Sequence, residues 1–569
     1  MYTVKIITVE KSRMLENEAN ERGLSFAEMM ENAGRSTALA IRRRLGSAEG
    51  SPLAGKRILV LVGPGNNGGD GLVAAHYLWE MGARVTCYLW KRSVEGDANC
   101  QRVQGDRLPM IWSADDPGFE ALRGLVSGAD VVVDALLGVG VDRPIGGTLQ
   151  ELLNVVRQAV LERKTPPDPV TVIPLNLARE IPGSASSGPM VVAVDCPSGL
   201  NCDTGELDPS TLPANLTVTF AYPKVGLLRF PGAEAAGDLV VADIAIPPQL
   251  ADDVSLEMAT SERIRGWLPA RPRSAHKGTF GRALIVAGSE NYIGAAALAG
   301  AGAKRVGTGL VTMALPAPIQ MGVAANLAEA TYLLLPHDLG VIANGAVKVL
   351  RQRTGEYDAL LLGPGITQEK ETVAFVHAFL HLEPSERKGR IGFVSESTTG
   401  SSGELADLPP LVVDADGLSA LAVAAGWWKA LPPGTILTPH PGEMARLMGG
   451  QVTAREIQAD REGVTQRMAT EWQAVVVLKG AFTVVAGPDG RVMVLPFANP
   501  ALATAGSGDV LAGAIVGLRA QGLPAFEAAV AGSYVHGLAG ELARAELGDM
   551  GVVAGDLPPR LPLALRQIR

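Results

Sequence analysis

The chain has 569 residues, several times the length of a typical single domain, so the sequence predicts two large domains rather than one core. Hydrophobic residues make up 47% of it and charged residues 19%, which excludes a disordered protein. The 50 Lys and Arg against 59 Asp and Glu give a formal net charge of −9 without a long basic run, so no nucleic-acid partner is expected.

The cysteine pattern and the apolar stretches favour the cytoplasm. The four cysteines form no CxxC pair, which is typical of reduced thiols, and the amino-terminal segment lacks the apolar core of a signal peptide. Residues 306–328 are uncharged and long enough to cross a bilayer, but Pro316, Pro318 and several glycines interrupt them. We therefore expect buried strand and loop there, in a cytoplasmic protein without a membrane partner.

The first half of the chain alternates apolar runs with Gly-rich turns and helical segments. A helical region at 25–45 precedes five strand candidates, at 57–62, 84–89, 131–133, 190–194 and 216–220. Most of these runs are continuously apolar, as expected of strands covered on both faces. A Pro-rich polar segment at 163–189 is expected to be a surface excursion.

The second half repeats this alternation, with strand candidates at 282–286, 310–313, 359–362, 411–413, 475–478 and 483–485. Between the halves, residues 246–275 are rich in proline and polar side chains, and we place the domain boundary there, near residue 255. The sequence thus predicts an α/β protein with two domains, 1–250 and 251–569, each a mostly parallel sheet flanked by helices.

The motif GPGNNGGDG, residues 63–71, lies between the first predicted strand and the next helix. It contains GxGxxG, but a dinucleotide site of that kind also requires an acidic residue at the end of the next strand, where this chain has Trp90-Lys91-Arg92. The glycines explain a tight turn but not the polar residues Asn66, Asn67 and Asp70, which we interpret as ligand groups. The alternative is a turn whose polar residues only cap the helix.

Oxygen-bearing side chains stand at the ends of two further predicted strands. Asp134 ends one strand before a glycine loop, and Asp195 and Ser198 follow the strand 190–194. Such oxygens at one edge of a parallel sheet suit a hard cation or a proton-transfer carboxylate. The alternative for each aspartate is a helix cap.

The densest motif of the second half is NPALATAGSGD, residues 499–509, which leads into the helix VLAGAIVGL. Small residues allow the N–H groups of a helix N-terminus to surround an anion, and Asp509 stands beside them as a candidate general base. This pairing is what phosphoryl transfer to a hydroxyl requires, and no GxxxxGK[ST] loop occurs. The alternative is a small-residue helix cap.

Three clusters accompany this motif: Gly363-Pro364-Gly365, TPHPGEMAR at 438–446, and KGAFT at 479–483, at a hairpin-like turn. His440 lies between two prolines that fix its direction, so we expect a ligand contact, with a structural role as the alternative. Lys479 is a candidate phosphate contact or a solvent-facing hairpin lysine.

In this order the motifs resemble the family of bifunctional NAD(P)H-hydrate repair enzymes, over nearly the whole chain. The resemblance includes GNNGGDG, VDALLGVGVDRP, VDCPSGL, LLGPG, VVDADGL, LTPHPGEMARL, VLKG and NPALATAGSGDVLAG. The chain departs from the family at Ala501 and Ala505, where glycine is usual, and in the insert at 163–189. The resemblance implies a Rossmann-like epimerase domain of YjeF-N type fused to a ribokinase-like, ADP-dependent dehydratase.

For the first domain, the resemblance implies interconversion of the R and S epimers of NADH or NADPH hydrated at C6 (NADHX and NADPHX). Asp195 would be the acid/base residue, and Asn67, Asp134 and Ser198 would bind K⁺. The substrate would contact Asn66, Asn67, Gly68, Gly69, Asp70, Gly138, Val139, Gly140, Val141, Asp142, Arg143, Pro144 and Asp195.

For the second domain, the resemblance implies dehydration of the S epimer with ADP as phosphate donor, giving NAD(P)H, AMP and phosphate. Asp509 would take the hydroxyl proton, and Mg²⁺ would bridge the phosphates. The substrate would contact Ala295, Gly365, His440, Pro441, Gly442, Glu443, Met444, Ala445, Arg446 and Asp509. ADP would contact Lys479, Gly480, Ala481, Phe482, Thr483, Asn499, Pro500, Ala501, Leu502, Ala503, Thr504, Ala505, Gly506, Ser507 and Gly508. We also expect a homo-oligomer.

Two other functions remain open at this point. One is a ribokinase-like small-molecule kinase with a non-catalytic binding scaffold as its first domain, although the polar residues Asp70, Asp134 and Asp195 argue against an eroded site. The other is an NAD-linked oxidoreductase, which the missing acidic residue after the second strand weakens.

Overall fold

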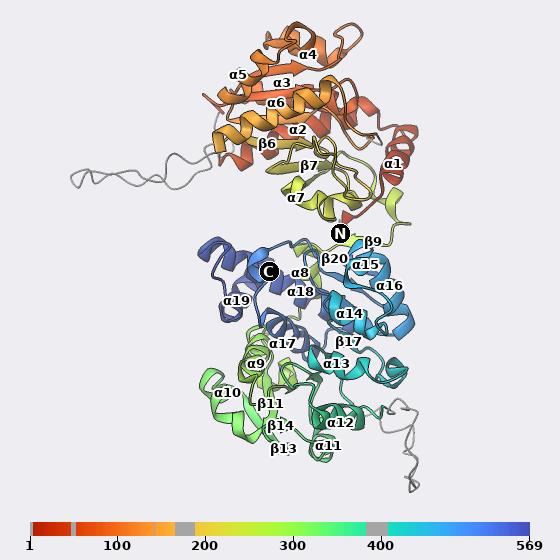
Figure 1. Cartoon of the computed structure of the whole chain (residues 1–569), viewed down its shortest axis with the longest axis vertical. Helices are drawn as coiled ribbons and strands as arrows, with labels where there is room; N and C mark the ends of the chain where they lie inside the picture. The colour runs from red at the N-terminus through yellow and green to blue at the C-terminus, as the bar shows by residue number, and fades with distance from the viewer. Residues whose placement is uncertain (1–3, 47–52, 141–142, 165–187, 383–407) are drawn as a thin grey trace, which may run out of the picture. The chain divides into compact units, whose positions relative to one another are not determined.

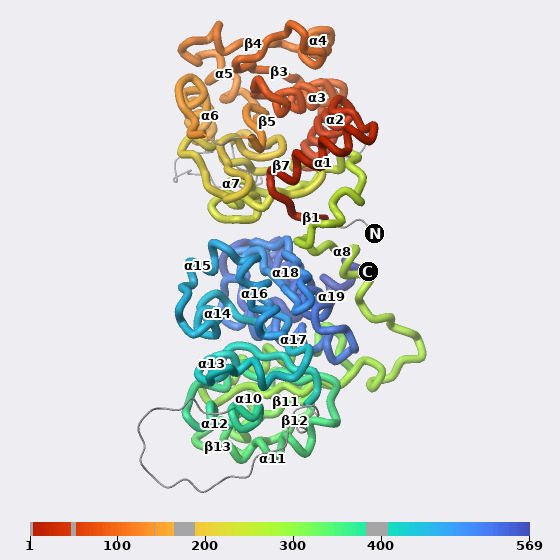
Figure 2. Tube along the Cα trace, turned by 90° about the vertical axis from the view of Figure 1, so that its right-hand side faces the viewer, coloured from red at the N-terminus to blue at the C-terminus, as the bar shows by residue number. Residues whose placement is uncertain are grey.

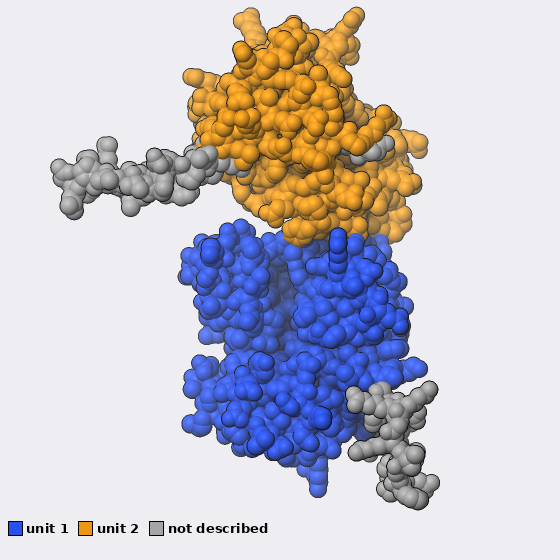
Figure 3. Space-filling model, viewed as in Figure 1, with its two compact units in different colours: residues 1–3, 255–569 blue, residues 4–254 orange. Residues whose placement is uncertain are grey.

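The computed structural model describes residues 4–46, 53–140, 143–164, 188–382 and 408–569. The described chain divides into two compact units, residues 4–254 and 255–569 (Figures 1 and 3). The division falls inside the Pro-rich region 246–275. Most of the expected surface excursion at 163–189 lies outside the described residues.

The unit 4–254 is built on a seven-stranded parallel sheet with the strand order β4-β3-β2-β5-β6-β7-β8. Its strands are β2 (Arg57–Val62), β3 (Arg84–Leu89), β4 (Met110–Trp112), β5 (Val131–Ala135), β6 (Met190–Val194), β7 (Leu216–Phe220) and β8 (Asp238–Ala242); a short strand, β1 (Val4–Lys5), precedes them. The order runs outward in both directions from β2 and β5. Ligands bind at the carboxyl ends of strands at such a switch point.

Helices cover both faces of this sheet (Figure 1). They are α1 (Val9–Glu21), α2 (Phe26–Arg44), α3 (Asn66–Glu80), α4 (Ala98–Gly105), α5 (Glu120–Gly128), α6 (Thr148–Lys164) and α7 (Gly232–Ala236). Alternate strand residues point to opposite faces, so Ile58 and Val60 pack with α1 to α4, whereas Leu59 and Leu61 pack with α5 and α6. Helix α2 begins with a capping box in which Ser25 and Glu28 satisfy each other's backbone amides.

The unit 255–569 contains a larger, mostly parallel sheet. From β9 outward its strand order is β9-β20-β19-β18-β17-β16-β15-β10-β11-β12, with antiparallel pairing only at β18-β19 and β19-β20 among these neighbours. Its strands are β9 (Leu256–Met258), β10 (Arg282–Val286), β11 (Leu310–Pro316), β12 (Thr331–Leu335), β15 (Ala359–Leu362), β16 (Leu411–Val413), β17 (Ile436–Leu437), β18 (Val475–Leu478), β19 (Val484–Ala486) and β20 (Val492–Val494); β13 (His337–Asp338) and β14 (Val341–Ile342) form a separate hairpin.

Helix α17 runs through the middle of this unit and is buried along most of its length. The helices of the unit are α8 (Ser261–Trp267), α9 (Ile293–Arg305), α10 (Gln320–Asn326), α11 (Ala346–Arg351), α12 (Lys370–Phe379), α13 (Asp416–Ala422), α14 (Pro441–Leu447), α15 (Ala454–Ala459), α16 (Arg461–Trp472), α17 (Ser507–Ala520), α18 (Ala525–Leu547) and α19 (Leu557–Ile568). Small residues let α9 and α17 approach closely: a Cβ on Gly513 would lie 2.0 Å from the Ala299 carbonyl oxygen.

The predicted α/β class with two mostly parallel sheets is confirmed, and most strand candidates agree with the structure. The strand expected at 131–133 continues to residue 135, so Asp134 lies inside β5 rather than after it. The stretch 306–328 contains strand β11 as expected, but residues 320–326 form helix α10 rather than loop. None of the helices in the described ranges combines the length and apolarity that a bilayer crossing requires.

The close contact of α9 with α17 makes a pair of glycine substitutions informative. Gly513→Ala is expected to lower the free energy of unfolding of the unit 255–569 by about 1–3 kcal/mol, because its methyl group meets a backbone carbonyl that cannot move alone. Gly294→Ala on α9 meets no atom within 4 Å and should be neutral or stabilising, since alanine favours the helix. Calorimetric unfolding of both variants checks this, and equal transitions for the two would contradict the packing argument.

Candidate active sites

The carboxyl ends of β2, β5 and β6 bring together the polar residues of the first predicted site. Strand β2 leads through a tight turn into α3, which begins at Asn66. A Cβ on Gly63 would lie 1.8 Å from the Leu136 carbonyl oxygen, so only glycine lets this turn approach the segment after β5. The N-cap of α3 is Gly65, without a side-chain cap, so the polar residues of the motif do not cap the helix.

Asp134 and Ser198 form a fully buried oxygen cluster. The Ser198 hydroxyl donates to Asp134 Oδ1 at 2.7 Å and its amide donates to Asp134 Oδ2 at 2.9 Å. The Leu137 amide donates to Ser198 Oγ at 2.9 Å, and Asn67 Nδ2 donates to the Leu137 carbonyl at 2.9 Å. Burial raises the pKa of Asp134, whereas these hydrogen bonds oppose the rise. The three residues predicted to hold a cation are therefore connected through one chain of hydrogen bonds.

Asp195 lies just past β6 and is held by a lysine that the sequence did not single out as functional. Lys224 Nζ contacts Asp195 Oδ1 at 2.6 Å, and Thr219 Oγ1 and the Phe220 amide donate to the same oxygen at 3.0 and 3.2 Å. Lys224 is 1% exposed; burial alone would lower its pKa, but the Asp195 carboxylate raises it. Since all three bonds end on Oδ1, the other carboxylate oxygen is available to a substrate. The left-handed backbone of Asp195, with φ of +62°, marks a constrained position.

A cavity of about 710 Å³ opens beside these groups. Of the predicted substrate contacts, it is lined by Asn66, Asn67, Asp70, Gly138, Val139, Gly140 and Asp195. Gly68 and Gly69 instead pack against the Gly63 carbonyl and Met30, and Arg143 and Pro144 do not line the cavity. Val141 and Asp142 lie outside the described residues.

Two acids in the cavity wall have raised pKa values. Burial raises the pKa of Asp70 well above its usual range, and the charges of Asp195 and Glu16 add to this. Burial also raises the pKa of Glu16, which Lys224 partly opposes. Glu16 was not predicted, because α1 reads as an ordinary polar helix. Only the fold places it at this cavity.

Arg92 occupies the position where a dinucleotide site would have an acidic residue. Its Nη1 donates to the carbonyls of Gly63 and Gly65 at 2.8 Å each, and its guanidinium pairs with Asp97 at 2.6 Å. A cation that holds the glycine turn in place cannot accept a ribose hydroxyl bond. The acidic residue that the NAD-linked oxidoreductase hypothesis requires is therefore missing at this position.

In the unit 255–569, Asp509 stands in the first turn of α17 beside free backbone donors. The amides of Gly508 and Asp509, like the Asp509 carboxylate, have no hydrogen-bond partner within the described part of the chain. Burial raises the pKa of Asp509 to about 7, and the charge of Asp414 adds to the effect while Lys479 opposes it. An aspartate with such a pKa can accept a proton near neutrality, and the amides can hold an anion.

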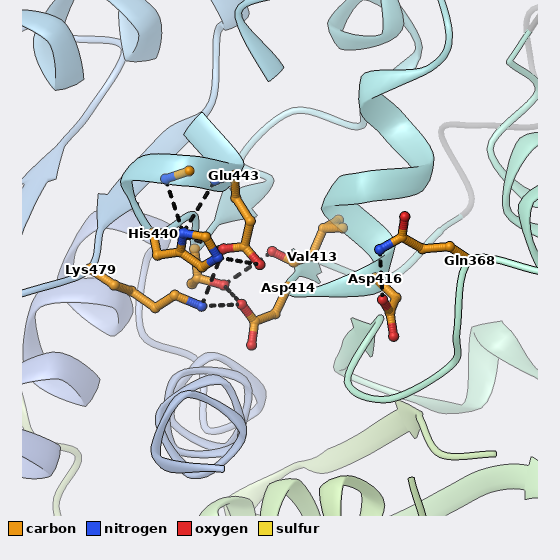
Figure 4. A network of polar contacts seen from close by, with 9 residues as sticks. Gln368, Val413, Asp414, Asp416, His440, Glu443 and Lys479 are labelled. Carbon is orange, nitrogen blue, oxygen red and sulfur yellow. Dashed lines mark hydrogen bonds and ion pairs between the residues drawn. The ribbon is translucent and has the colours of Figure 1, made fainter. Parts of the chain in front are cut away.

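Lys479 is not the solvent-facing hairpin lysine that the sequence left open. Its Nζ contacts Asp414 Oδ1 at 2.7 Å and lies 3.7 Å from Glu443 Oε2 (Figure 4). Thr438 Oγ1 also donates to Asp414 Oδ1, at 2.7 Å. Burial would lower the pKa of Lys479, but Asp414 and Glu443 raise it. A Cβ on Gly508 would lie 3.5 Å from Lys479 Nζ, so the ammonium group also reaches the start of α17.

His440 caps helix α14, which is the structural role predicted as the alternative to a ligand contact. Its Nδ1 accepts from the amides of Gly442 and Glu443 at 3.0 and 3.3 Å, while its own amide donates to Glu443 Oε2 at 2.8 Å. This capping box starts α14 and fixes Glu443 toward Lys479 (Figure 4). Burial lowers the pKa of His440, and its outer nitrogen, Nε2, lies 3.6 Å from Glu443 Oε1.

The remaining predicted contacts include two neighbouring residues, Gly365 and Ala295, and the loop 499–508. A Cβ on Gly365 would lie 2.8 Å from the Ala295 Cβ, so these two positions adjoin. In the loop 499–508, Asn499 Oδ1 accepts from the Ala501 amide, and Asn499 Nδ2 is buried without a hydrogen-bond partner among the described residues. Gly506, with φ of +89°, starts α17. Asn499 therefore has a free buried donor in the loop predicted to bind a nucleotide.

Three polar residues of this site were not predicted. Asp414 and Asp416 follow a buried strand in the sequence VVDADGL, the same pattern that indicated Asp134. Asp416 accepts a hydrogen bond from the Thr367 amide at 2.9 Å. His536 on α18 lies beneath the α17 turn, with Nε2 2.9 Å from the Ser507 carbonyl oxygen, and burial lowers its pKa to about 4. No sequence pattern marks His536. Across the described ranges, no set of three or more His, Cys, Asp or Glu is arranged to hold a metal.

The architecture is that of a two-unit α/β protein with a cluster of buried or partly buried carboxyl groups in each unit. Residues 26–226 match the family described as YjeF-related protein N-terminus, and residues 283–386 and 401–562 match the family described as NAD(P)H-hydrate dehydratase. Together these observations place the chain in the family of bifunctional NAD(P)H-hydrate repair enzymes, to which it belongs. The family predicted from the sequence is confirmed.

Relatives with that name extend over the whole chain. The bifunctional NAD(P)H-hydrate repair enzyme of Moorella thermoacetica is 38% identical over 550 residues, which cover 95% of this chain and 92% of that protein. The enzyme of the same name from Thermofilum pendens is 36% identical over 573 residues, covering 100% and 97%. A solved ADP/ATP-dependent NAD(P)H-hydrate dehydratase from Bacillus subtilis, co-crystallised with ATP and Mg²⁺, is 31% identical, with coverage of 55% and 98% and a TM-score of 0.43.

The raised pKa of Asp509 predicts that the difference in stability between the wild type and Asp509→Asn depends on pH. In the folded chain the pKa of this carboxyl is about 7, whereas its ordinary pKa is 3.8. The unfolded chain therefore loses this proton at lower pH than the folded chain, so the folded state is destabilised as pH rises from about 4 to about 7. Asp509→Asn removes this effect and should be more stable than the wild type at pH 8, by up to roughly 4 kcal/mol. Chemical unfolding at pH 5 and pH 8 measures the difference. A difference that does not grow with pH would contradict the assignment.

Proposed function

We propose that this chain repairs hydrated NADH and NADPH in two steps. The unit 4–254 interconverts the R and S hydrates, and the unit 255–569 dehydrates the S hydrate with ADP, giving NAD(P)H, AMP and phosphate. The observation that carries the proposal is that each unit holds a carboxylate in an environment suited to proton transfer, Asp195 just past β6 and Asp509 in the first turn of α17. Family membership over the full chain supports the substrate class.

Epimerisation at C6 requires that the oxygen substituent leave and return, which needs a group that gives and takes a proton. Asp195 is that group in our proposal, because its Oδ1 is fixed by three donors and its other oxygen borders the cavity. Lys224 positions this carboxylate through its contact with Oδ1. Asp70, whose buried carboxyl has a raised pKa, can supply a proton to the departing oxygen.

The buried oxygens near β5 fit a monovalent cation. Asn67, Asp134 and Ser198 would hold K⁺, since one chain of hydrogen bonds through Leu137 joins them and Asp134 and Ser198 are 0% exposed. A bound cation would supply positive charge beside the substrate's phosphates. The protein's part is to hold Asp134 in place with hydrogen bonds from Ser198 and Leu136, which favour its charged form against the effect of burial.

For dehydration, Asp509 takes the proton of the C6 hydroxyl, whose oxygen then attacks the terminal phosphoryl group of ADP with AMP as leaving group. Phosphate next departs from C6 with the electrons of the C–O bond and C5 loses a proton to solvent, so that the C5=C6 double bond of the dihydronicotinamide ring is restored. The free amides of the first turn of α17 and the Lys479 ammonium group lie where negative charge on the phosphoryl oxygens must be balanced. Mg²⁺, when bound, would neutralise the phosphates further.

Three finer features belong to the same proposal. ADP rather than ATP is the expected donor, and Gly480, Thr483 and the 499–508 loop are expected to contact it. The active form is expected to be a cytoplasmic homo-oligomer. A repair assay run separately with ADP and with ATP decides the donor.

The function is tested with enzymatically prepared NADH hydrate. Wild-type chain with ADP should restore the absorbance of the reduced nicotinamide, and Asp509→Asn should lose about 100- to 10,000-fold of the rate, because an amide cannot accept the hydroxyl proton. The wild-type rate should rise with pH through about 7 as Asp509 loses its proton. Exposed Asp338→Asn is the matched control. A variant that keeps half of the wild-type rate, or a flat pH profile, would remove Asp509 as the base.

The epimerase step is tested with a mixed pool of R and S hydrates. Asp195→Asn should leave the R epimer to accumulate at early times while the S epimer is still repaired, because the two sites lie in separate units. Asp115→Asn, an exposed change in the same unit, should behave like the wild type. Equal early consumption of both epimers by wild type and Asp195→Asn would favour the alternative of a non-catalytic first domain.

A further inference from the structure

A second cavity of the unit 255–569, of about 380 Å³, lies apart from the Asp414 and Asp509 site. It is bounded by the turn after α8, the end of α9, the end of α17 and the last turns of α19. The carboxyl-terminal residue and α8 meet here, since Arg569 Nη2 donates to the Pro269 carbonyl at 2.8 Å (Figure 2). Asp509 stands at one end of α17 and this cavity at the other, roughly 15 Å away at 1.5 Å per helical residue.

All charged side chains that line this cavity are positive. Four arginines line it, Arg271, Arg305, Arg566 and Arg569, and no aspartate or glutamate does. None of the four forms an ion pair with any residue in the described ranges, although the chain as a whole has a net charge of −9. Burial lowers the pKa of Arg271, and the positive charge of Arg569 lowers it further. A bound anion would relieve this repulsion.

Arg271 is held in place before any ligand arrives. Its Nη2 donates to the Gly307 carbonyl at 2.7 Å and to Gln521 Oε1 at 2.6 Å, and its guanidinium lies 3.8 Å from the Phe280 ring centre. A Cβ on Gly307 would lie 2.0 Å from Arg271 Nη2, so only glycine leaves room for the guanidinium. The remaining N–H groups, on Nε and Nη1, are free to bind an anion.

We propose that this cavity binds a phosphate-bearing ligand of mononucleotide size, such as AMP or ADP. Guanidinium groups bind phosphate oxygens through paired hydrogen bonds, and four of them can neutralise a diphosphate. Leu268, Val306 and Pro562 supply an apolar wall for a base, and the volume is within the range of small-molecule sites. The site is separate from the proposed active site and does not depend on it.

The test is the number of ADP molecules that the full chain binds in equilibrium dialysis at low ionic strength. Arg305 and Arg566 are chosen for replacement because neither donates a hydrogen bond within the described residues, so Arg305→Gln/Arg566→Gln should fold normally. The wild type should bind one more ADP per chain than this double variant, or bind it at least about 10-fold more tightly. Arg43→Gln, an exposed arginine in the other unit, is the control and should match the wild type.

Further probes identify the chemistry that the cavity recognises. AMP should occupy the extra site and adenosine should not, and inorganic pyrophosphate should compete with ADP if the phosphates dominate binding. Should the double variant unfold, ADP must instead protect Arg305 and Arg566 of the wild type from phenylglyoxal. Equal binding of ADP, AMP and pyrophosphate by wild type and double variant, or no protection of these arginines, would overturn the proposal.

Discussion

Both candidate active sites depend on a buried ion pair between a lysine and an aspartate at the carboxyl end of a parallel strand. Lys224 pairs with Asp195 at 2.6 Å and Lys479 pairs with Asp414 at 2.7 Å, and in each pair one partner is 1% exposed. Burying two such charges costs several kcal/mol per ion unless geometry and further hydrogen bonds compensate. Thr219 and Thr438 supply those hydrogen bonds. Loss of either lysine would leave its aspartate partner, Asp195 or Asp414, as an uncompensated charge at the carboxyl end of a strand.

The two pairs serve proton transfer in different ways. In the unit 4–254 the paired aspartate is itself the proposed acid/base group, and two other acids of the cavity wall, Asp70 and Glu16, have raised pKa values. In the unit 255–569 the pair lies beside the proposed base, Asp509, whose carboxylate has no partner among the described residues. Each site therefore combines a carboxylate fixed by a lysine with a nearby acid whose pKa is raised.

Close backbone approach decides where these side chains can stand. Gly63 meets the Leu136 carbonyl, and Gly513 meets the Ala299 carbonyl, at distances that no side chain permits. The first contact brings the turn after β2 against the segment after β5, and the second presses α17 against α9. The oxygen cluster around Asp134 and the open amides at the start of α17 follow from these contacts.

The sequence by itself determined the class of fold, because apolar runs ending in glycine and aspartate mark the carboxyl ends of buried parallel strands. It also marked Asp195, after such a strand, and Asp509, at a small-residue helix start, as candidate acid/base residues. It could not determine which distant residues complete each site. Lys224, Glu16 and His536 carry no local signal, since an isolated charged residue has the same pattern whether it is solvated or buried. The tertiary structure decided that the Lys479 side chain turns inward to Asp414, that His440 caps α14, and that four arginines from separate segments share one cavity, because long-range packing alone sets their burial and their partners.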